Sequence, residues 1–144
     1  MLTIQNIELT DLEQFALLCD ELFGAKTNRL NLAQSLEKIM ANPAYILIGA
    51  KDNGQLIGTV MGIVCFDTVG ECQPFMVLEN LIVNKNSHRQ GVGKMLVNYL
   101  EDRAREQNCY YIMLCSSGKR IEAHKFYEHI GYPENIVKGF KKFL

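Results

Sequence analysis

At residues 81–94 the chain reads LIVNKNSHRQGVGK, and this stretch decides which fold we expect. An apolar run ends at Val83, a polar segment follows, and Gly91 and Gly93 then open a run with helical spacing. The first turn of a helix carries free backbone N–H groups and the positive end of the helix dipole. Because glycines let an anion approach the backbone, the stretch predicts a strand, a phosphate-binding turn and a helix.

Two familiar phosphate loops do not fit this stretch. A P-loop needs a glycine where His88 stands, and a dinucleotide fingerprint needs a third glycine where Leu96 stands. Gly-x-Gly alone is also compatible with a purely structural turn. The rest of the chain therefore has to indicate what the turn binds.

Hydrophobic periodicity predicts ten secondary-structure elements. Strands are expected at residues 2–8, 44–51, 55–66, 75–83, 110–115 and 136–143. Helices are expected after an N-cap at Thr10-Asp11, across 32–40 up to Asn42-Pro43, from Gly91 onward, and around 120–130. The first has the spacing of a buried face at Leu12, Phe15, Ala16, Cys19 and Leu22, and the second has one apolar side made of Leu32, Leu36, Ile39 and Met40. The order β-α-α-β-β-β-α-β-α-β indicates an α/β (α+β) fold, a mixed, twisted sheet flanked by helices.

Two local signals support these boundaries. Asn53-Gly54 lies between two apolar runs and predicts a tight hairpin turn, because such a turn requires positive φ. Gly131 follows the last helical pattern and is expected at its C′ position.

Composition limits the class of protein. The 144 residues suit one domain, and the formal net charge of −1 argues against a dedicated nucleic-acid binder.

No apolar stretch approaches the ~20 residues of a membrane-spanning helix, so we expect no membrane partner. Five cysteines, with no Cys-x-x-Cys pair, argue against a disulfide framework and a thiolate zinc site. Reduced thiols and the lack of a signal-peptide core favour a cytoplasmic location.

The stretch 81–94 resembles motif A of the GNAT superfamily of N-acetyltransferases. In that motif R/Q-x-x-G-x-G/A follows a strand and binds the pyrophosphate of coenzyme A. A second segment, LCSSGKRIEAHKFYEHIGY at 114–132, is similar to the superfamily's A-x-x-F-Y-E-x-x-G-F/Y segment. The two segments occur in the expected order, and the predicted elements match over nearly the whole chain. The resemblance implies a GNAT-like fold with acetyl-CoA as cosubstrate and no metal.

The resemblance also implies which residues hold acetyl-CoA: Leu81, Ile82, Val83, Arg89, Gln90, Gly91, Val92, Gly93 and Lys94. The three strand residues would serve through a splayed backbone that pairs with the pantetheine arm. Two positions depart from the pattern, because His88 replaces the usual Arg or Gln and Arg120 replaces an Asn often seen in the second motif. Backbone amides dominate phosphate binding in such loops, so binding is expected to survive the His88 change.

Glu79 is the candidate general base. A substrate amine with a pKa near ~10.4 arrives protonated and must lose a proton before it can attack a thioester. A carboxylate in an otherwise apolar strand is unusual, and some GNAT members carry a Glu at this place. Strand alternation predicts that Glu79 shares a face with Val77, Leu81 and Val83. The alternative is a salt-bridged or rim-exposed Glu.

Tyr127 is the candidate general acid, because the resemblance places it near the thioester sulfur. A phenol with a pKa of ~10 is protonated at neutral pH and can donate to the departing thiolate. The alternative is that Tyr127 only packs, like Phe126. His124 could orient Tyr127, although a structural role fits it better, and Cys115 is expected to be a buried structural thiol.

The expectation is a single domain, residues 1–144, that transfers an acetyl group directly from acetyl-CoA to a small-molecule or peptide amine. The alternatives are a non-catalytic acyl-CoA sensor and an unrelated α/β domain with a structural glycine turn. In the superfamily the substrate is set by variable segments, here expected at 21–31, 66–74 and 132–139. Four acidic residues in or near these segments could attract a cationic amine: Asp20, Glu21, Asp67 and Glu71. The identity of the amine and a homodimer are left open.

Overall fold

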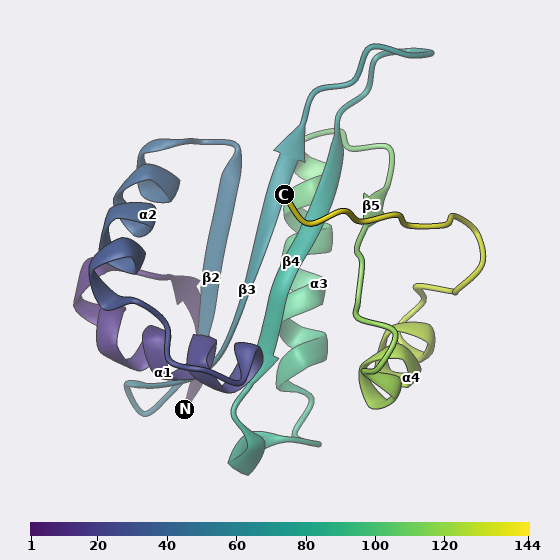
Figure 1. Cartoon of the computed structure of the whole chain (residues 1–144). Helices are drawn as coiled ribbons and strands as arrows, with labels where there is room; N and C mark the ends of the chain where they lie inside the picture. Colours follow the sequence, from purple (N-terminus) through teal and green to yellow (C-terminus); the bar gives the residue numbers. More distant parts are fainter. The chain divides into compact units, whose positions relative to one another are not determined.

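The structure is a computed structural model that describes residues 1–144. They form two compact units, Met1–Met113 and Leu114–Leu144. The first unit is built on a five-stranded sheet in the order β1-β2-β3-β4-β5 (Figure 1). Its strands are β1 (Leu2–Asn6), β2 (Tyr45–Asp52), β3 (Gln55–Cys65), β4 (Phe75–Val83) and β5 (Ile112–Met113).

The sheet is mixed, as the sequence predicts. The first four strands pair in antiparallel fashion, and β5 runs parallel to β4. The predicted hairpin is confirmed, because Asp52 pairs with Gln55 around Asn53 and Gly54, whose φ values are 50° and 84°. β5 is shorter than the predicted 110–115, since only Ile112 and Met113 pair with β4.

Three helices belong to the first unit: α1 (Leu12–Phe23), α2 (Arg29–Ala41) and α3 (Val92–Glu106). Short 3₁₀ turns precede two of them, η1 (Leu9–Asp11) and η2 (Lys85–Ser87). α1 and α2 cover one face of the sheet and α3 covers the other (Figure 1). α2 ends just before Asn42-Pro43, which agrees with the conformational restriction that proline imposes on the preceding residue.

Each face of the sheet has its own apolar layer. On the α1–α2 side the buried cluster comprises Ile7, Phe15, Leu18, Leu36, Leu47 and Leu56. Met40, which the helical pattern places on the same side of α2 as Leu36, is half-exposed at the end of the helix. On the other side the buried residues of α3 are Val92, Leu96, Val97, Leu100 and Ala104.

Two glycines of β3 let α3 approach the sheet closely. A Cβ at Gly58 would lie 3.3 Å from Cδ1 of Leu96, and one at Gly62 would lie 3.0 Å from Cδ2 of Leu100. These distances are at or below ordinary van der Waals contact, so side chains at either position would push α3 away.

The start of α1 differs in detail from the prediction. Asp11 is the N-cap residue, but its side chain makes no cap hydrogen bond to α1. It accepts the backbone N–H of Glu8 at 3.0 Å and pairs with Nζ of Lys51 at 2.7 Å. The carboxylate thus joins the entry of α1 to β2, because the ammonium of Lys51, whose side chain is only 13% exposed, needs a partner.

The second unit contains α4 (Ile121–His129). Gly131 follows it with φ 101°, and the N–H of Tyr132 donates to the carbonyl of Tyr127 at 2.8 Å, so the predicted C′ role of Gly131 is confirmed. The predicted strand at 136–143 does not form. Residues 136–144 are all exposed and pair with no strand, because an apolar pattern needs a sheet edge to become a strand.

Candidate functional site

A bulge interrupts β4 next to the candidate base. Asn80 has φ 55°, and the pairing with β3 shifts there: Met61 pairs with Glu79, whereas Thr59 pairs with Ile82. One extra residue on β4 therefore lies between the two pairs, as in a β-bulge. Bulges bend a strand and re-aim the side chains that follow them.

The bulge corrects one prediction about the face on which Glu79 lies. Met61, the partner of Glu79, packs against the α1–α2 cluster, and so does Ile82. Val83, in contrast, lies against the α3 side, where its Cγ2 is close to Gly58 beside Leu96. Leu81 shares the face of Val83, because alternation resumes after the bulge. Glu79 therefore faces α1 and α2, and the prediction that it shares a face with Leu81 and Val83 is wrong.

The carboxylate of Glu79 is half-buried and makes no ion pair or hydrogen bond. The salt-bridged alternative therefore does not describe it. A partly dehydrated carboxylate without a partner is free to accept a proton from a ligand.

β4 has an unpaired edge beyond the bulge. β5 pairs only with Met76 and Val77, so Leu81, Ile82 and Val83 have no strand beside them on that edge. Unpaired backbone groups at a sheet edge can bind an extended ligand in the manner of an added strand. The contact of these three residues with coenzyme A stays a prediction.

The loop between β4 and α3 is held at several points. The side chain of Asn84 accepts the N–H of Asn86 at 2.9 Å, and the N–H of Lys85 donates to Oε1 of Glu21 at 3.1 Å. Nε2 of His88 lies 2.7 Å from the carbonyl of Val83, which requires a proton on that nitrogen. His88 thus closes the loop onto the end of β4, in the position where the motif usually has Arg or Gln.

The predicted phosphate turn has the geometry of an anion site. Gly91 is the N-cap of α3 with φ 77°, and no side chain caps the helix. Its carbonyl accepts the N–H of Met95 at 3.0 Å, so the N–H groups of Val92, Gly93 and Lys94 precede the first helical bond. A Cβ at Gly91 would meet nothing within 4 Å, so the space above the turn is open.

Charged and polar side chains surround this open turn. Arg89, Gln90 and Lys94 are all exposed, and Arg89 adopts φ 65°, a left-handed conformation that is uncommon for Arg. Backbone donors, the helix dipole and two cations form a donor set that fits a pyrophosphate. The residues present are therefore able to hold the phosphates of a coenzyme.

Tyr127 lies in the second unit, on α4. It is 8% exposed, and its ring makes edge contacts with Phe126 at 5.4 Å and Tyr132 at 6.4 Å between ring centres. The ring therefore packs within its own unit, whatever its hydroxyl does. That Tyr127 and Glu79 act on the same reacting atoms stays a prediction.

The sequence also predicts roles for two other residues of the second unit, His124 and Cys115. Nε2 of His124 lies 2.8 Å from the carbonyl of Ser117, and its Nδ1 lies 3.6 Å from Oε1 of Glu134. This arrangement supports the structural role of His124. Cys115 is exposed, so its expected burial is wrong, and all five cysteines are free.

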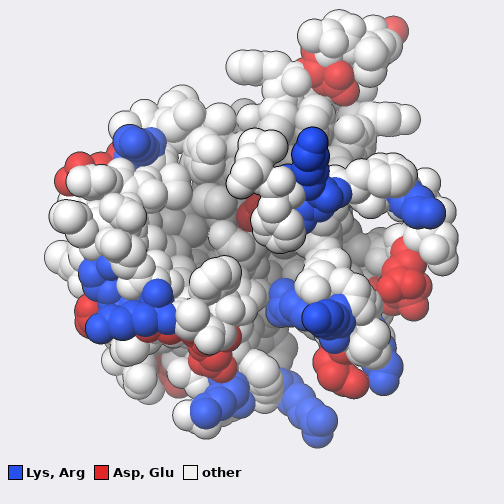
Figure 2. All heavy atoms as spheres, in the orientation of Figure 1, with Lys and Arg blue, Asp and Glu red and all other residues white.

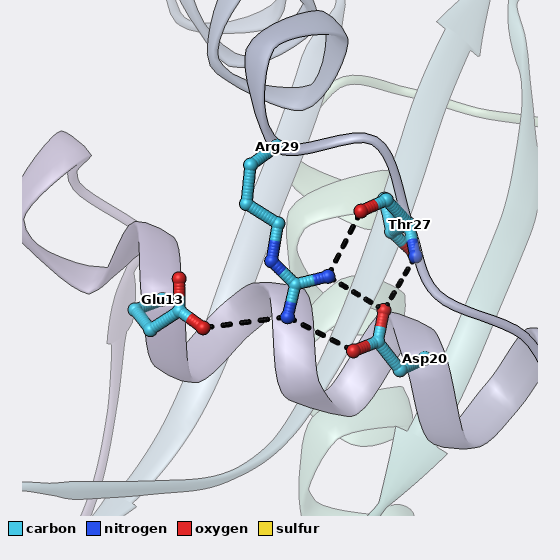
Figure 3. Close-up of polar contacts among 4 residues, drawn as sticks. All are labelled: Glu13, Asp20, Thr27 and Arg29. Atoms are coloured by element: carbon cyan, nitrogen blue, oxygen red, sulfur yellow. Dashed lines mark hydrogen bonds and ion pairs between the residues drawn. The ribbon is translucent and has the colours of Figure 1, made fainter.

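Asp20, near the end of α1, has structural partners in the turn that follows (Figure 3). Asp20 accepts the N–H of Thr27 at 2.6 Å and two guanidinium bonds from Arg29 at 2.8 and 2.9 Å. Hydrogen bonding from Arg29 holds the pKa of the Asp20 carboxyl well below its ordinary value. Asp20 therefore closes the turn between α1 and α2, and its carboxylate is paired with Arg29. Glu21 accepts only the backbone N–H of Lys85, so its exposed carboxylate has no cationic partner.

Sequence reasoning missed a pocket between α1, α2 and the sheet. Its volume is about 190 Å³, and its lining is mainly apolar: Phe15, Cys19, Leu22, Leu32, Ser35, Leu36, Ile39, Leu47, Thr59, Met61, Asn80 and Ile82. The helical pattern identified most of these α1 and α2 residues as buried. Periodicity cannot distinguish a residue that packs against the core from one that lines a pocket.

Charge is mixed on the face of the molecule that Figure 2 shows. Lys and Arg lie among Asp and Glu, in line with the net charge of −1. No group of three or more His, Cys, Asp or Glu side chains is arranged to hold a metal ion. No helix is both long enough and apolar enough to cross a membrane.

Known proteins resemble this chain over nearly its full length. A structure titled a transcriptional regulator from Bacillus halodurans C-125 superposes with a TM-score of 0.93, at 20% identity and 100% coverage of both chains. Glucosamine-6-phosphate N-acetyltransferase from Arabidopsis thaliana gives a TM-score of 0.85, at 20% identity and 99% coverage of both chains. Aminoglycoside antibiotic 6′-N-acetyltransferase from Acinetobacter haemolyticus gives 0.81, at 21% identity and 99% coverage of both chains.

At these identities the structural likeness shows the fold alone. The sequence model of the acetyltransferase (GNAT) family, however, matches residues 8–132. That match spans most of the chain and includes both the glycine turn and the Phe126-Tyr127-Glu128 segment. This chain therefore belongs to the GNAT family of acetyltransferases.

Proposed function

We propose that this protein is an N-acetyltransferase that moves an acetyl group from acetyl-CoA to a primary amine by direct attack. The observation that carries the proposal is the uncapped first turn of α3, opened by Gly91, directly after the unpaired edge of β4. The two features together offer a pyrophosphate site and, next to it, backbone for an extended arm. Residues 1–144, with both compact units, would act as a single domain.

The binding residues follow from this geometry. The N–H groups of Val92, Gly93 and Lys94 would hold the pyrophosphate, with Arg89 and Gln90 beside it. The backbone of Leu81, Ile82 and Val83 would pair with the pantetheine arm, which directs the thioester toward the bulge. Bound acetyl-CoA supplies the activated acetyl group for the reaction.

Glu79 would act as the general base. Its half-buried, unpaired carboxylate accepts a proton from the substrate ammonium, directly or through a water molecule. The neutral amine then forms a bond to the acetyl carbon. Because Glu79 faces α1 and α2, the amine would arrive from that side of the sheet.

Tyr127 would act as the general acid. As the carbon–sulfur bond breaks, the sulfur keeps the electron pair and the phenol of Tyr127 supplies it with a proton. The nitrogen still carries the extra proton from the attack and returns it, through solvent, to the phenolate, which leaves the neutral amide and the Tyr127 phenol. This role rests on the match of the second motif, in which the Tyr follows a Phe and precedes a Glu.

Related structures support an amine acceptor. The Arabidopsis and Acinetobacter proteins are N-acetyltransferases named for glucosamine-6-phosphate and an aminoglycoside antibiotic, both of which carry amino groups. Five free cysteines support a cytoplasmic location, where thiols stay reduced.

Turnover with a panel of amines tests the proposal. We expect at least one class of primary amine to release free thiol from acetyl-CoA and to yield the acetylated amine by mass spectrometry. Binding of acetyl-CoA with no turnover by any amine would instead identify a sensor domain. Failure to bind acetyl-CoA would contradict both functions.

A further inference from the structure

The pocket between α1, α2 and the sheet runs from the surface into the core. Leu36 and Thr59 are 0% and 2% exposed and lie at its inner end, whereas Ser35 and Asn80 are exposed and lie at its mouth. No Asp, Glu, Lys or Arg lines it. Such a pocket has no charged group to recognise a phosphate or a polycation.

The few polar groups in the pocket offer little to a polar ligand. The hydroxyl of Thr59 donates to the carbonyl of Ile48 at 2.7 Å, so its proton is already used. The thiol of Cys19 is partly buried, and burial raises its pKa to about 11, so it stays neutral. A sugar ring placed here would lose hydrogen bonds to water without replacing them.

The pocket adjoins the proposed site of proton transfer through two neighbours of Glu79. Asn80, at the mouth, directly follows Glu79, and Met61, in the wall, is the cross-strand partner of Glu79. An amine nitrogen held at the carboxylate of Glu79 therefore has the mouth of the pocket beside it. The substituent on that nitrogen is the part of the acceptor nearest to the pocket.

We propose that this pocket binds an apolar group of the acceptor, so that the substrate is a primary amine with a short aliphatic or aromatic chain. The inference rests on the proposed N-acetyltransferase function and narrows its substrate class. The volume suits it, since about 190 Å³ exceeds the ~150 Å³ apolar cavity that holds a benzene molecule. The acceptor class therefore differs from the sugar amines named for the related structures.

Four amines test the substrate class: 2-phenylethylamine and 3-methylbutylamine against 2-aminoethanol and glucosamine. Thiol release from acetyl-CoA is measured at matched concentrations of unprotonated amine. We expect kcat/KM to be at least about 10-fold higher for the two apolar amines, because one methylene in an apolar pocket already discriminates about 10- to 200-fold.

Two variants distinguish the effect of blocking the pocket from a general disturbance of α2. Ser35→Phe places a ring at the mouth of the pocket, and Ser35 is exposed, so the fold should tolerate it. Gln34→Phe introduces the same side chain on the same helix at an exposed position that does not line the pocket. We expect Ser35→Phe to raise KM for 2-phenylethylamine about 10-fold or more, and by a clearly larger factor than KM for 2-aminoethanol, and Gln34→Phe to change neither.

The outcomes distinguish this inference from the proposed function. If glucosamine and 2-aminoethanol react as well as the apolar amines, and Ser35→Phe has no selective effect, the transferase stands and the pocket assignment is overturned. If no amine reacts, calorimetry with 2-phenylethylamine and coenzyme A gives the second readout. Binding that Ser35→Phe abolishes would then keep the apolar ligand site and reject the transferase, whereas no binding would overturn both.

Discussion

The β-bulge at Asn80 determines which residues lie on the same face of the sheet as Glu79. The bulge at Asn80 leaves Glu79 paired with Met61 on the α1–α2 side, while Leu81 turns toward α3. At the scale of single residues, the proposed chemistry depends on two groups, the carboxylate of Glu79 and the phenol of Tyr127.

Glu79→Gln should keep the shape of the side chain and remove the proton acceptor. We expect kcat/KM to fall by about 10²- to 10⁴-fold, with a change in the acidic limb of the pH–rate profile. Glu106→Gln, at the exposed C-terminal end of α3, is the matched control and should have no effect. An unchanged pH profile for Glu79→Gln would show that another group, or bulk water, removes the proton.

Tyr127→Phe should keep the ring contacts with Phe126 and Tyr132 and remove the donor. We expect kcat to fall by about 10²-fold, the low end for general acids, because a coenzyme A thiolate is already a fair leaving group. KM for acetyl-CoA should change little, since the predicted pyrophosphate site lies on α3. Tyr110→Phe, at an exposed position, serves as the control. Full kcat for Tyr127→Phe, with chemistry shown to limit turnover, would make Tyr127 a packing residue.

At the scale of elements, two ion pairs hold α1 in place. The pair of Asp11 with Lys51 joins its start to β2, and the pair of Asp20 with Arg29 joins its end to α2. Their side chains differ in burial: those of Asp11 and Lys51 are 6% and 13% exposed, whereas those of Asp20 and Arg29 are both 24% exposed.

Asp11→Ala should destabilise the protein strongly. It leaves the ammonium of Lys51 buried without a partner, which typically costs about 3–5 kcal/mol of unfolding free energy. Urea denaturation measures the loss. Glu122→Ala, which breaks the exposed pair with Lys125, should cost no more than about 0.5 kcal/mol. Equal effects of the two substitutions would show that the Asp11–Lys51 pair is not an important part of the core.

Asp20 should make stability depend on pH in the acid range. Because its pKa is lowered in the folded state, it stabilises the fold above its unfolded pKa of ~3.9 and loses that contribution as pH falls below this value. We expect Tm to drop below about pH 4 in the native protein, and to drop less in Asp20→Asn. Parallel Tm curves for the two proteins would contradict this linkage.

At the scale of the whole molecule, acetyl-CoA should stabilise the fold. Ligand at 100 times its Kd adds about 2.7 kcal/mol, which corresponds to a rise in Tm of roughly 5–10 °C for a chain of this size. Gly91→Glu should abolish the rise, because its carboxylate would lie over the phosphate turn and repel the pyrophosphate.

Gly70→Glu is the matched control for this experiment. Gly70 also has positive φ, 57° against 77° at Gly91, and a Cβ at either residue would meet nothing within 4 Å. Both substitutions therefore impose a similar backbone strain, and only Gly91→Glu should remove the response to acetyl-CoA. An equal response in both variants would place the coenzyme elsewhere.

Most elements could be predicted from the sequence because local interactions determine them. Asn53-Gly54 accepts the positive φ of a tight turn, Pro43 restricts the residue before it and ends α2, and Gly91 opens α3. The strand at 75–83 and the mixed sheet follow from the order of apolar runs. The family, too, could be identified from two segments of sequence.

Only the tertiary structure decided which side chains meet. The extra residue at Asn80 appears only when β4 is paired with β3, and it reverses the face that alternation predicts for Leu81 and Val83. The tail at 136–143 has a strand-like pattern but pairs with no strand, because an apolar pattern alone does not supply the backbone partners that a strand needs. The apolar pocket likewise exists only where α1 and α2 cross the sheet, because packing between distant segments leaves that space unfilled.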